Sequence, residues 1–146
     1  MANFQEKNIE NLKENDEILS FDEKTKTFQK TKIKKLAQQI HSNLYEIQFE
    51  KSKVIVTDDY PFYFEGKYYA ILKNSKYVAT SKLEIGNYVN TFDQNKIGKE
   101  KVISIKKLDL KEMTYTIIEL EENELFLANN LLVKTEKLAV TEAAIK

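Results

Sequence analysis

The chain has 146 residues, of which 42% are apolar and 32% charged, which is typical of one folded domain. Basic and acidic residues number 23 each, so no net charge favours nucleic acid or an anionic membrane surface, and no apolar run is long enough to span a membrane. The absence of cysteine excludes disulfides, thiolate catalysis and cysteine-ligated zinc in this chain.

Short runs of β-branched and aromatic residues, separated by polar turns, predict strands along the chain. In chain order these runs cover residues 17–21, 44–49, 53–57, 101–105 and 114–120. The run at 44–49, Leu-Tyr-Glu-Ile-Gln-Phe, alternates apolar and polar residues as in a sheet with one solvated face. We therefore expect an all-β domain of mostly antiparallel strands, with at most a short helix in the C-terminal tail.

Two polar features have simple structural interpretations. The lysine-rich stretch at 32–35 is expected to be a solvated strand edge that resists aggregation. His41, the single histidine, lies in the sequence His-Ser-Asn, which is typical of a loop, and we expect a structural or surface role for it.

The sequence contains an internal repeat. Residues 33–36, Ile-Lys-Lys-Leu, recur at 105–108, and a second match places the segment 11–22 over 82–93. Because Asn and Gly enter the left-handed backbone region at least cost, the pairing of Asn15 with Gly86 predicts the same tight turn in both halves. The halves should therefore be related by a pseudo-twofold axis. The matched pairs are Leu12 and Leu83, Asn15 and Gly86, Ile18 and Val89, Phe21 and Phe92, and Asp22 and Asp93.

The corner at residues 54–63, Val-Ile-Val-Thr-Asp-Asp-Tyr-Pro-Phe-Tyr, collects polar groups directly after a predicted strand. Adjacent strand residues point to opposite faces, so Asp58 and Asp59 are poorly placed to share a metal ion. We expect one of them to cap the backbone of the turn. The acidic run at 119–124 lacks the spacing and glycine of a calcium loop, so we expect neither a metal nor a cofactor.

Aromatic residues concentrate in the segment 60–69. Such clusters usually pack a core, here at the junction of the two halves. The alternative is a peptide-binding groove lined by tyrosines, which would make the chain a peptide- or protein-binding β domain.

Four segments, in this order, resemble conserved blocks of the Hint superfamily, the module shared by inteins, bacterial intein-like domains and the Hedgehog autoprocessing region. Residues 9–25 resemble I-E-x-L-K-x-G-D-x-V-L-S-Y-D, and 54–64 resemble V-T-x-x-H-P-F. Residues 77–89 resemble W-V-x-A-x-x-L-K-x-G-D-x-V, and 115–135 resemble Y-N-L-x-V-x-D-x-H-x-F-x-V-N-G-L-L-V-H-N.

The resemblance implies a fold and a division of the chain. The fold would be a horseshoe of antiparallel strands with a pseudo-twofold internal repeat. The domain would cover residues 1–135, with halves at about 8–64 and 77–135, and would be followed by a C-terminal tail at 136–146.

The resemblance also implies a chemistry. In the family an N-terminal Cys or Ser attacks the preceding carbonyl, the histidine of T-x-x-H protonates the departing nitrogen, and a closing His-Asn pair lets the asparagine cyclise. In this chain the positions that match the splicing blocks hold Thr57, Asp59, Tyr60, Glu124, Lys134 and Thr135. Only the threonine is kept, since Tyr60 and Glu124 stand at histidine positions, and Lys134 and Thr135 stand at the closing His-Asn.

Phe4 to Asn8 correspond to the turn after the family's first strand, so that strand and its nucleophile are expected to be absent. Tyrosine and lysine have reference pKa values of about 10 and 10.4, far from those of good acid and base catalysts at neutral pH. We therefore expect a degenerate Hint-like domain without splicing or self-cleavage, acting as a folded module of a larger polypeptide.

The alternative is an active autoprocessing domain whose nucleophile strand was trimmed or mutated; a carboxyl at Glu124 would serve as a base if it were buried. The expected partners are flanking protein segments or another protein, not nucleic acid or a membrane. No signal peptide is expected, so the default location is cytoplasmic.

Overall fold

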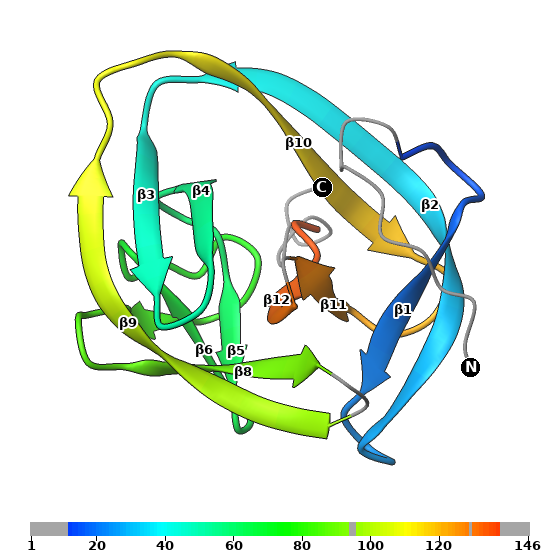
Figure 1. Ribbon diagram of the computed structural model, residues 1–146. Helices are drawn as coiled ribbons and strands as arrows, with labels where there is room; N and C mark the ends of the chain where they lie inside the picture. Colours follow the sequence, from blue (N-terminus) through cyan, green and yellow to red (C-terminus); the bar gives the residue numbers. More distant parts are fainter. Residues whose placement is uncertain (1–11, 94–95, 129, 138–146) are drawn as a thin grey trace.

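In the computed structural model, residues 12–93, 96–128 and 130–137 are described, and their regular elements are all strands (Figure 1). No helix in these ranges is long and apolar enough to cross a membrane. The strands are β1 (Glu17–Asp22), β2 (Thr27–His41), β3 (Leu44–Phe49), β4 (Lys53–Thr57), β5 (Phe62–Phe64), β6 (Lys67–Ala70), β7 (Ser81–Lys82), β8 (Tyr88–Asp93), β9 (Lys96–Lys107), β10 (Glu112–Leu120), β11 (Leu125–Ala128) and β12 (Leu131–Lys134).

The strands form one curled sheet in the order β10-β2-β1-β11-β12-β8-β9-β3-β4, and β5, β6 and β7 branch from β12. Its pairings are antiparallel except for the parallel contact of β6 with β7. In Figure 1 the long strands β2, β9 and β10 form an arc around β11 and β12, which lie near the centre. The expected all-β horseshoe is confirmed.

The predicted turn recurs in both halves with the same geometry. Asn15 has φ of 76° and Gly86 has φ of 97°, so both adopt the left-handed conformation. The amide of Asn15 donates to the carbonyl of Ile33 over 2.8 Å, and the amide of Gly86 donates to that of Val102 over 2.9 Å. The repeat in the sequence is therefore a repeat in the structure.

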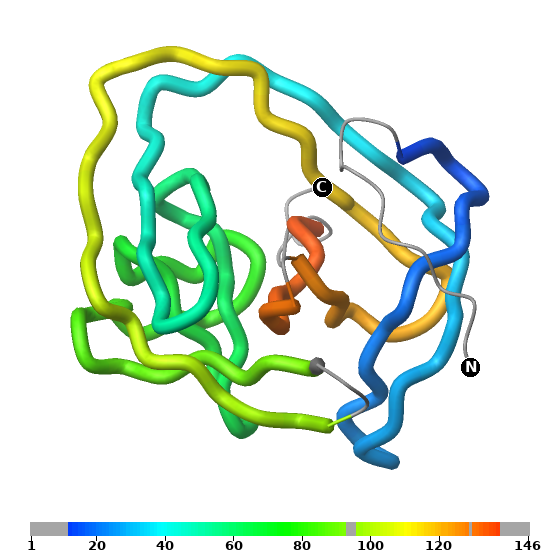
Figure 2. The backbone as a smooth tube through the Cα atoms, viewed as in Figure 1, coloured from blue at the N-terminus to red at the C-terminus, as the bar shows by residue number. Residues whose placement is uncertain are grey.

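The two halves exchange strands. β2 pairs with β1 over its first residues and with β10 over its last, while β9 pairs first with β8 and then with β3. In Figure 2 the segment from β2 to β3, in cyan, runs alongside the segment from β9 to β10, in yellow. Each half thus supplies its third strand to the other half, so neither half has a complete sheet of its own.

A small contact joins the halves at the centre. Phe62 of β5 pairs with Val133 of β12, and these residues hold equivalent places in the two repeats. Both are buried within one large core cluster. The largest fully buried side chains are Phe49, Phe62, Ile33, Leu44, Ile47, Leu83, Ile117, Leu125, Leu131, Leu132, Val89 and Val102.

The aromatic cluster at 60–69 packs in the core, as predicted. Phe62 and Tyr63 are buried, and Tyr60 packs edge-on against Phe62 with ring centroids 5.4 Å apart. Tyr63 meets Tyr68 in the same manner at 5.5 Å. The first pair packs in the large core cluster and the second in a smaller one.

Two other expectations need correction or lie outside the described ranges. The lysines at 32–35 are exposed, but they lie where β2 changes partner from β1 to β10, and the outermost strands of the sheet path are β10 and β4. The prediction that these lysines are solvated is therefore confirmed, but the prediction that they lie at an edge of the sheet is wrong. The short C-terminal helix falls on residues 138–146, outside the described residues, while Lys134 ends β12 and 135–137 are irregular.

Candidate functional site

The corner after β4 is a tight turn. The amide of Tyr60 donates to the carbonyl of Thr57 over 3.3 Å, which reverses the chain, and Pro61 then leads directly into β5. The carbonyl of Asp58 accepts from the amide of Leu72 over 2.8 Å, which ties the corner to the loop at 71–80. Thr57 is buried, so its hydroxyl lies inside the fold.

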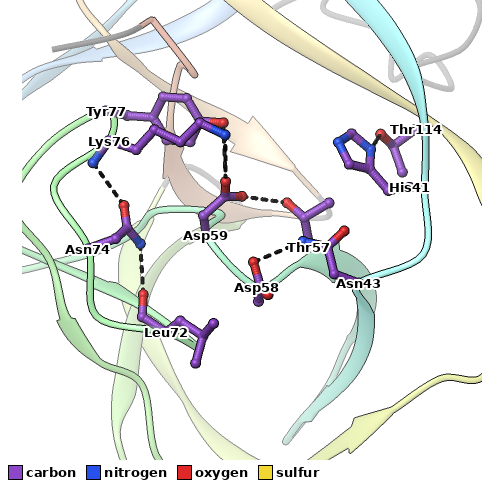
Figure 3. A network of polar contacts seen from close by, with 10 residues as sticks. All are labelled: His41, Asn43, Thr57, Asp58, Asp59, Leu72, Asn74, Lys76, Tyr77 and Thr114. Atoms are coloured by element: carbon purple, nitrogen blue, oxygen red, sulfur yellow. Dashed lines mark hydrogen bonds and ion pairs between the residues drawn. The ribbon is translucent and has the colours of Figure 1, made fainter. Parts of the chain in front are cut away.

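Asp59 lies at the centre of a polar network (Figure 3). Its Oδ1 accepts a hydrogen bond from the Thr57 hydroxyl over 2.8 Å. Its Oδ2 accepts from the Lys76 ammonium over 3.1 Å and from the Tyr77 hydroxyl over 3.4 Å. The threonine that the family motif retains therefore positions an aspartate, which in turn is held by a lysine and a tyrosine.

Asp58 points elsewhere. Its Oδ1 accepts from Nδ2 of Asn43 over 2.9 Å (Figure 3), so the two aspartates do not share partners in these contacts, as the strand geometry predicted. The expected backbone cap was wrong, because the hydrogen bonds that these two carboxylates accept within the described part of the chain come from side chains.

Tyr60, at the position of the motif's histidine, is packed against the core. Burial raises the pKa of its phenol above the ordinary value of tyrosine, and the nearby carboxylate of Glu136 raises it further. The phenol is therefore neutral throughout the physiological pH range, and it does not exchange a proton as an imidazole would.

The closing end of the domain lies against this corner. The amide of Lys134 donates to the carbonyl of Pro61 over 3.0 Å, and the amide of Thr135 donates to that of Glu124 over 2.8 Å. The six predicted positions are thus gathered into two neighbouring groups, of which one contains the corner residues and the other the closing residues.

Lys134 and Glu124, which both stand at histidine positions, form an ion pair with each other. The Lys134 ammonium lies 3.3 Å from Oε1 of Glu124, and the lysine side chain is only 6% exposed while that of the glutamate is 58% exposed. Thr135 beside them is buried. These residues satisfy one another and make structural contacts.

Sequence reasoning missed Glu136, which it assigned to the tail. The pKa of this carboxyl is raised to about 7, mainly by burial; a hydrogen bond from Thr116 lowers the pKa, the carboxylate of Asp59 raises it, and the ammonium of Lys76 lowers it. The pKa of Tyr77 is likewise raised to about 12, mainly by burial and also by the carboxylates of Glu136 and Asp59. The site thus holds one carboxyl that titrates near neutral pH.

No local pattern in the sequence could have found this group. Glu136 follows β12, Thr116 lies in β10, and Lys76 and Tyr77 lie in the loop before β7. Only the folded chain brings them beside Asp59. His41, by contrast, is the last residue of β2 and not part of the predicted loop. Its Nδ1 is 2.6 Å from the Thr114 hydroxyl of β10, which is a structural contact (Figure 3).

The described residues contain no group of three or more His, Cys, Asp or Glu side chains arranged to hold a metal ion. Around the corner, Glu136 can exchange a proton near neutral pH, and Asp59 accepts hydrogen bonds from Thr57, Lys76 and Tyr77.

Asp59→Ala is expected to lower the free energy of unfolding by about 1–3 kcal/mol, because the buried Thr57 hydroxyl loses its acceptor and Lys76 its partner. The Lys76 contact contributes little of this, because the lysine is about half exposed. Urea denaturation measures the change. Asp58→Ala is the matched control and should cost less, since one hydrogen bond is lost; an equal or larger loss in the control would contradict the central place of Asp59.

Comparison with known proteins gives matches by structure. No family model and no curated protein sequence matches the chain. A bacterial intein-like domain from Clostridium thermocellum superposes with a TM-score of 0.68 at 19% identity, covering 87% of this chain and 86% of that one. A DnaB intein from Synechocystis sp. PCC 6803 superposes with a TM-score of 0.64 at 14% identity, covering 87% of this chain and 84% of that one. A DnaX mini intein from Spirulina platensis superposes with a TM-score of 0.60 at 21% identity, covering 82% of this chain and 81% of that one.

These likenesses extend over most of every chain compared. At such low identity they show the fold, and the fold is that of inteins and bacterial intein-like domains.

Proposed function

We propose that this chain, which has the fold of inteins and intein-like domains, is a degenerate Hint domain that neither splices nor cleaves itself. It would act as a folded module of a larger polypeptide. Its partners would be the flanking protein segments or another protein, and it would need no cofactor.

The proposal rests on the residues that stand where the family motifs have three histidines. Tyr60 is packed against the core with its phenol neutral, and Lys134 and Glu124 form an ion pair with each other. A general acid or base works best with a pKa near the operating pH, and loss of one typically costs about 10²- to 10⁴-fold in rate. With three such positions changed, the combined loss supports a domain without autocatalysis.

The second candidate, an active autoprocessing domain, has one observation in its favour. Glu136 lies immediately after the closing positions, beside Asp59 and Tyr60, with a pKa of about 7. A carboxyl whose pKa lies near the operating pH is suited to general acid and base catalysis. If the chain does cleave a peptide bond, Glu136 is the residue that would move the proton.

A fusion experiment separates the two candidates. The chain would be placed between two unrelated reporter domains, purified at once and incubated at pH 7 for several days, with samples examined on denaturing gels. The proposal predicts that the fusion stays intact. The matched control carries Glu136→Gln, which removes the titrating carboxyl and keeps its size. Cleavage that occurs in the parent fusion and is lost in the control would establish the second candidate.

A third candidate, a peptide- or protein-binding β domain unrelated to inteins, predicts no internal twofold repeat. The repeated turns at Asn15 and Gly86 and the exchange of strands between the halves argue against it.

A further inference from the structure

β12 is followed by a short segment, Thr135–Lys137, which we term the closing segment. Its first residue is firmly held, because Thr135 is buried and donates its amide to the carbonyl of Glu124. Glu136 donates its amide to the carbonyl of Ile117 over 3.0 Å, which docks the segment against β10. Lys137 adds an ion pair to Glu119 at 3.6 Å, but both side chains are substantially exposed.

Beyond Thr135, each contact that docks the closing segment is weak. An exposed ion pair such as that of Lys137 contributes about 0–1 kcal/mol. A single backbone hydrogen bond contributes about 0.5–1.5 kcal/mol. The state of the Glu136 carboxyl can outweigh either contact.

The groups that surround this carboxyl come from three other parts of the chain. Asp59 and Tyr60 come from the corner, Lys76 and Tyr77 from the loop before β7, and Thr116 from β10. The charges among them are the carboxylate of Asp59 and the ammonium of Lys76, and the ammonium is already hydrogen-bonded to Asp59. An ionised Glu136 would therefore be a second carboxylate at a place where one lysine already serves the first.

We propose that the closing segment is a proton-controlled latch, which stays docked on β10 while the Glu136 carboxyl is protonated and is released when the carboxyl ionises. Release would begin at Glu136, because Thr135 and β12 are anchored in the core. The freed groups would be the carbonyl of Ile117 on β10 and the polar network around Asp59. This inference does not depend on whether the domain cleaves peptide bonds.

The direction of the effect follows from proton linkage. The docked carboxyl has a pKa of about 7, against an ordinary value of 4.5. The docked state therefore binds the proton more tightly than the released state. Docking is strongest below about pH 4.5, weakens as the pH rises toward 7, and changes little above that value.

Hydrogen exchange at the amide of Glu136, followed by NMR, tests the latch. After correction for the intrinsic pH dependence of exchange, the opening equilibrium should rise roughly 50- to 100-fold between pH 5 and pH 8. The amide of Ile33, in the core, reports global unfolding in the same sample and should remain far better protected.

Two variants make the test specific. Glu136→Gln keeps the size and the contact with Thr116 but cannot ionise, so its opening equilibrium should be independent of pH. His41→Asn removes the single histidine and should leave the parent pH dependence in place.

Three results would overturn the latch. They are an opening equilibrium in the parent chain that does not change with pH, the same pH dependence in Glu136→Gln, and exchange at Glu136 and Ile33 that rises in parallel. The last would mean that the whole domain unfolds and that no local release occurs.

Discussion

Phe62→Ala lowers the free energy of unfolding by about 3–5 kcal/mol, because it removes a ring from the contact that joins the two halves. Phe62 is 1% exposed and lies against the rings of Phe49 and Tyr60. It is also the register partner of Val133 across the pseudo-twofold axis. A cavity at this place has core on every side, so the neighbours can close it only in part. Chemical denaturation measures the change.

A matched control and a double-mutant cycle sharpen this expectation. Leu72→Ala removes a large apolar side chain that is 52% exposed, from the loop tied to the same corner, and should change stability by less than about 1 kcal/mol. Phe62→Ala combined with Val133→Ala should differ from the sum of the single changes by about 0.5–3 kcal/mol. Strict additivity would contradict direct contact across the axis.

Ile47→Ala and Ile117→Ala should each lower the free energy of unfolding by about 2–5 kcal/mol, and by similar amounts. These isoleucines occupy equivalent places in the two repeats, on the strands β3 and β10 that cross to the opposite half. They are 0% and 1% exposed. Because each strand completes the sheet of the other half, damage to either should unfold the domain as one unit. Thermal and urea unfolding, followed by circular dichroism and tyrosine fluorescence, measure both the size and the cooperativity of the loss.

Ile55→Ala is the control for this pair, since Ile55 lies on the neighbouring strand β4 but is 55% exposed, and its loss should cost less than about 1 kcal/mol. The exchange of strands would be contradicted if one isoleucine proved costly and the other nearly neutral. It would equally be contradicted if either variant unfolded in two separate transitions.

The repeat is the part of the fold that the sequence predicts best. Asn15 and Gly86 could be matched because few residues tolerate a positive φ, so a required turn leaves a mark on the residue type. The strands at 44–49 and 53–57 were found with their observed bounds, because they carry β-branched and aromatic residues in compact runs. The length of β2 was missed, since Gln38 and Gln39 lie in a ribbon with few apolar residues.

The candidate site was predicted in part. The motif found the corner and the closing residues because both are contiguous in sequence, and the fold does bring them together. It did not find Lys76, Tyr77 or Glu136, which reach the site from separate elements. Their properties depend on burial and on neighbouring charges, which local sequence does not encode.

The corner also has a purely structural role. Thr57 makes a hydrogen bond that holds the corner, and this structural use is independent of catalysis. Tyrosine fills the volume at position 60 and packs on Phe62, so burial that stabilises the core also fixes the phenol in its neutral form. The corner after β4 therefore contributes to the packing of the core.

The most direct test of the central proposal is the intact mass of the two-reporter fusion after incubation at pH 6, 7 and 8. The account predicts one species at every pH, with the mass of the uncleaved fusion. A defined pair of fragments whose masses add up to the fusion plus one water, or a ligated product that lacks this domain, would contradict it.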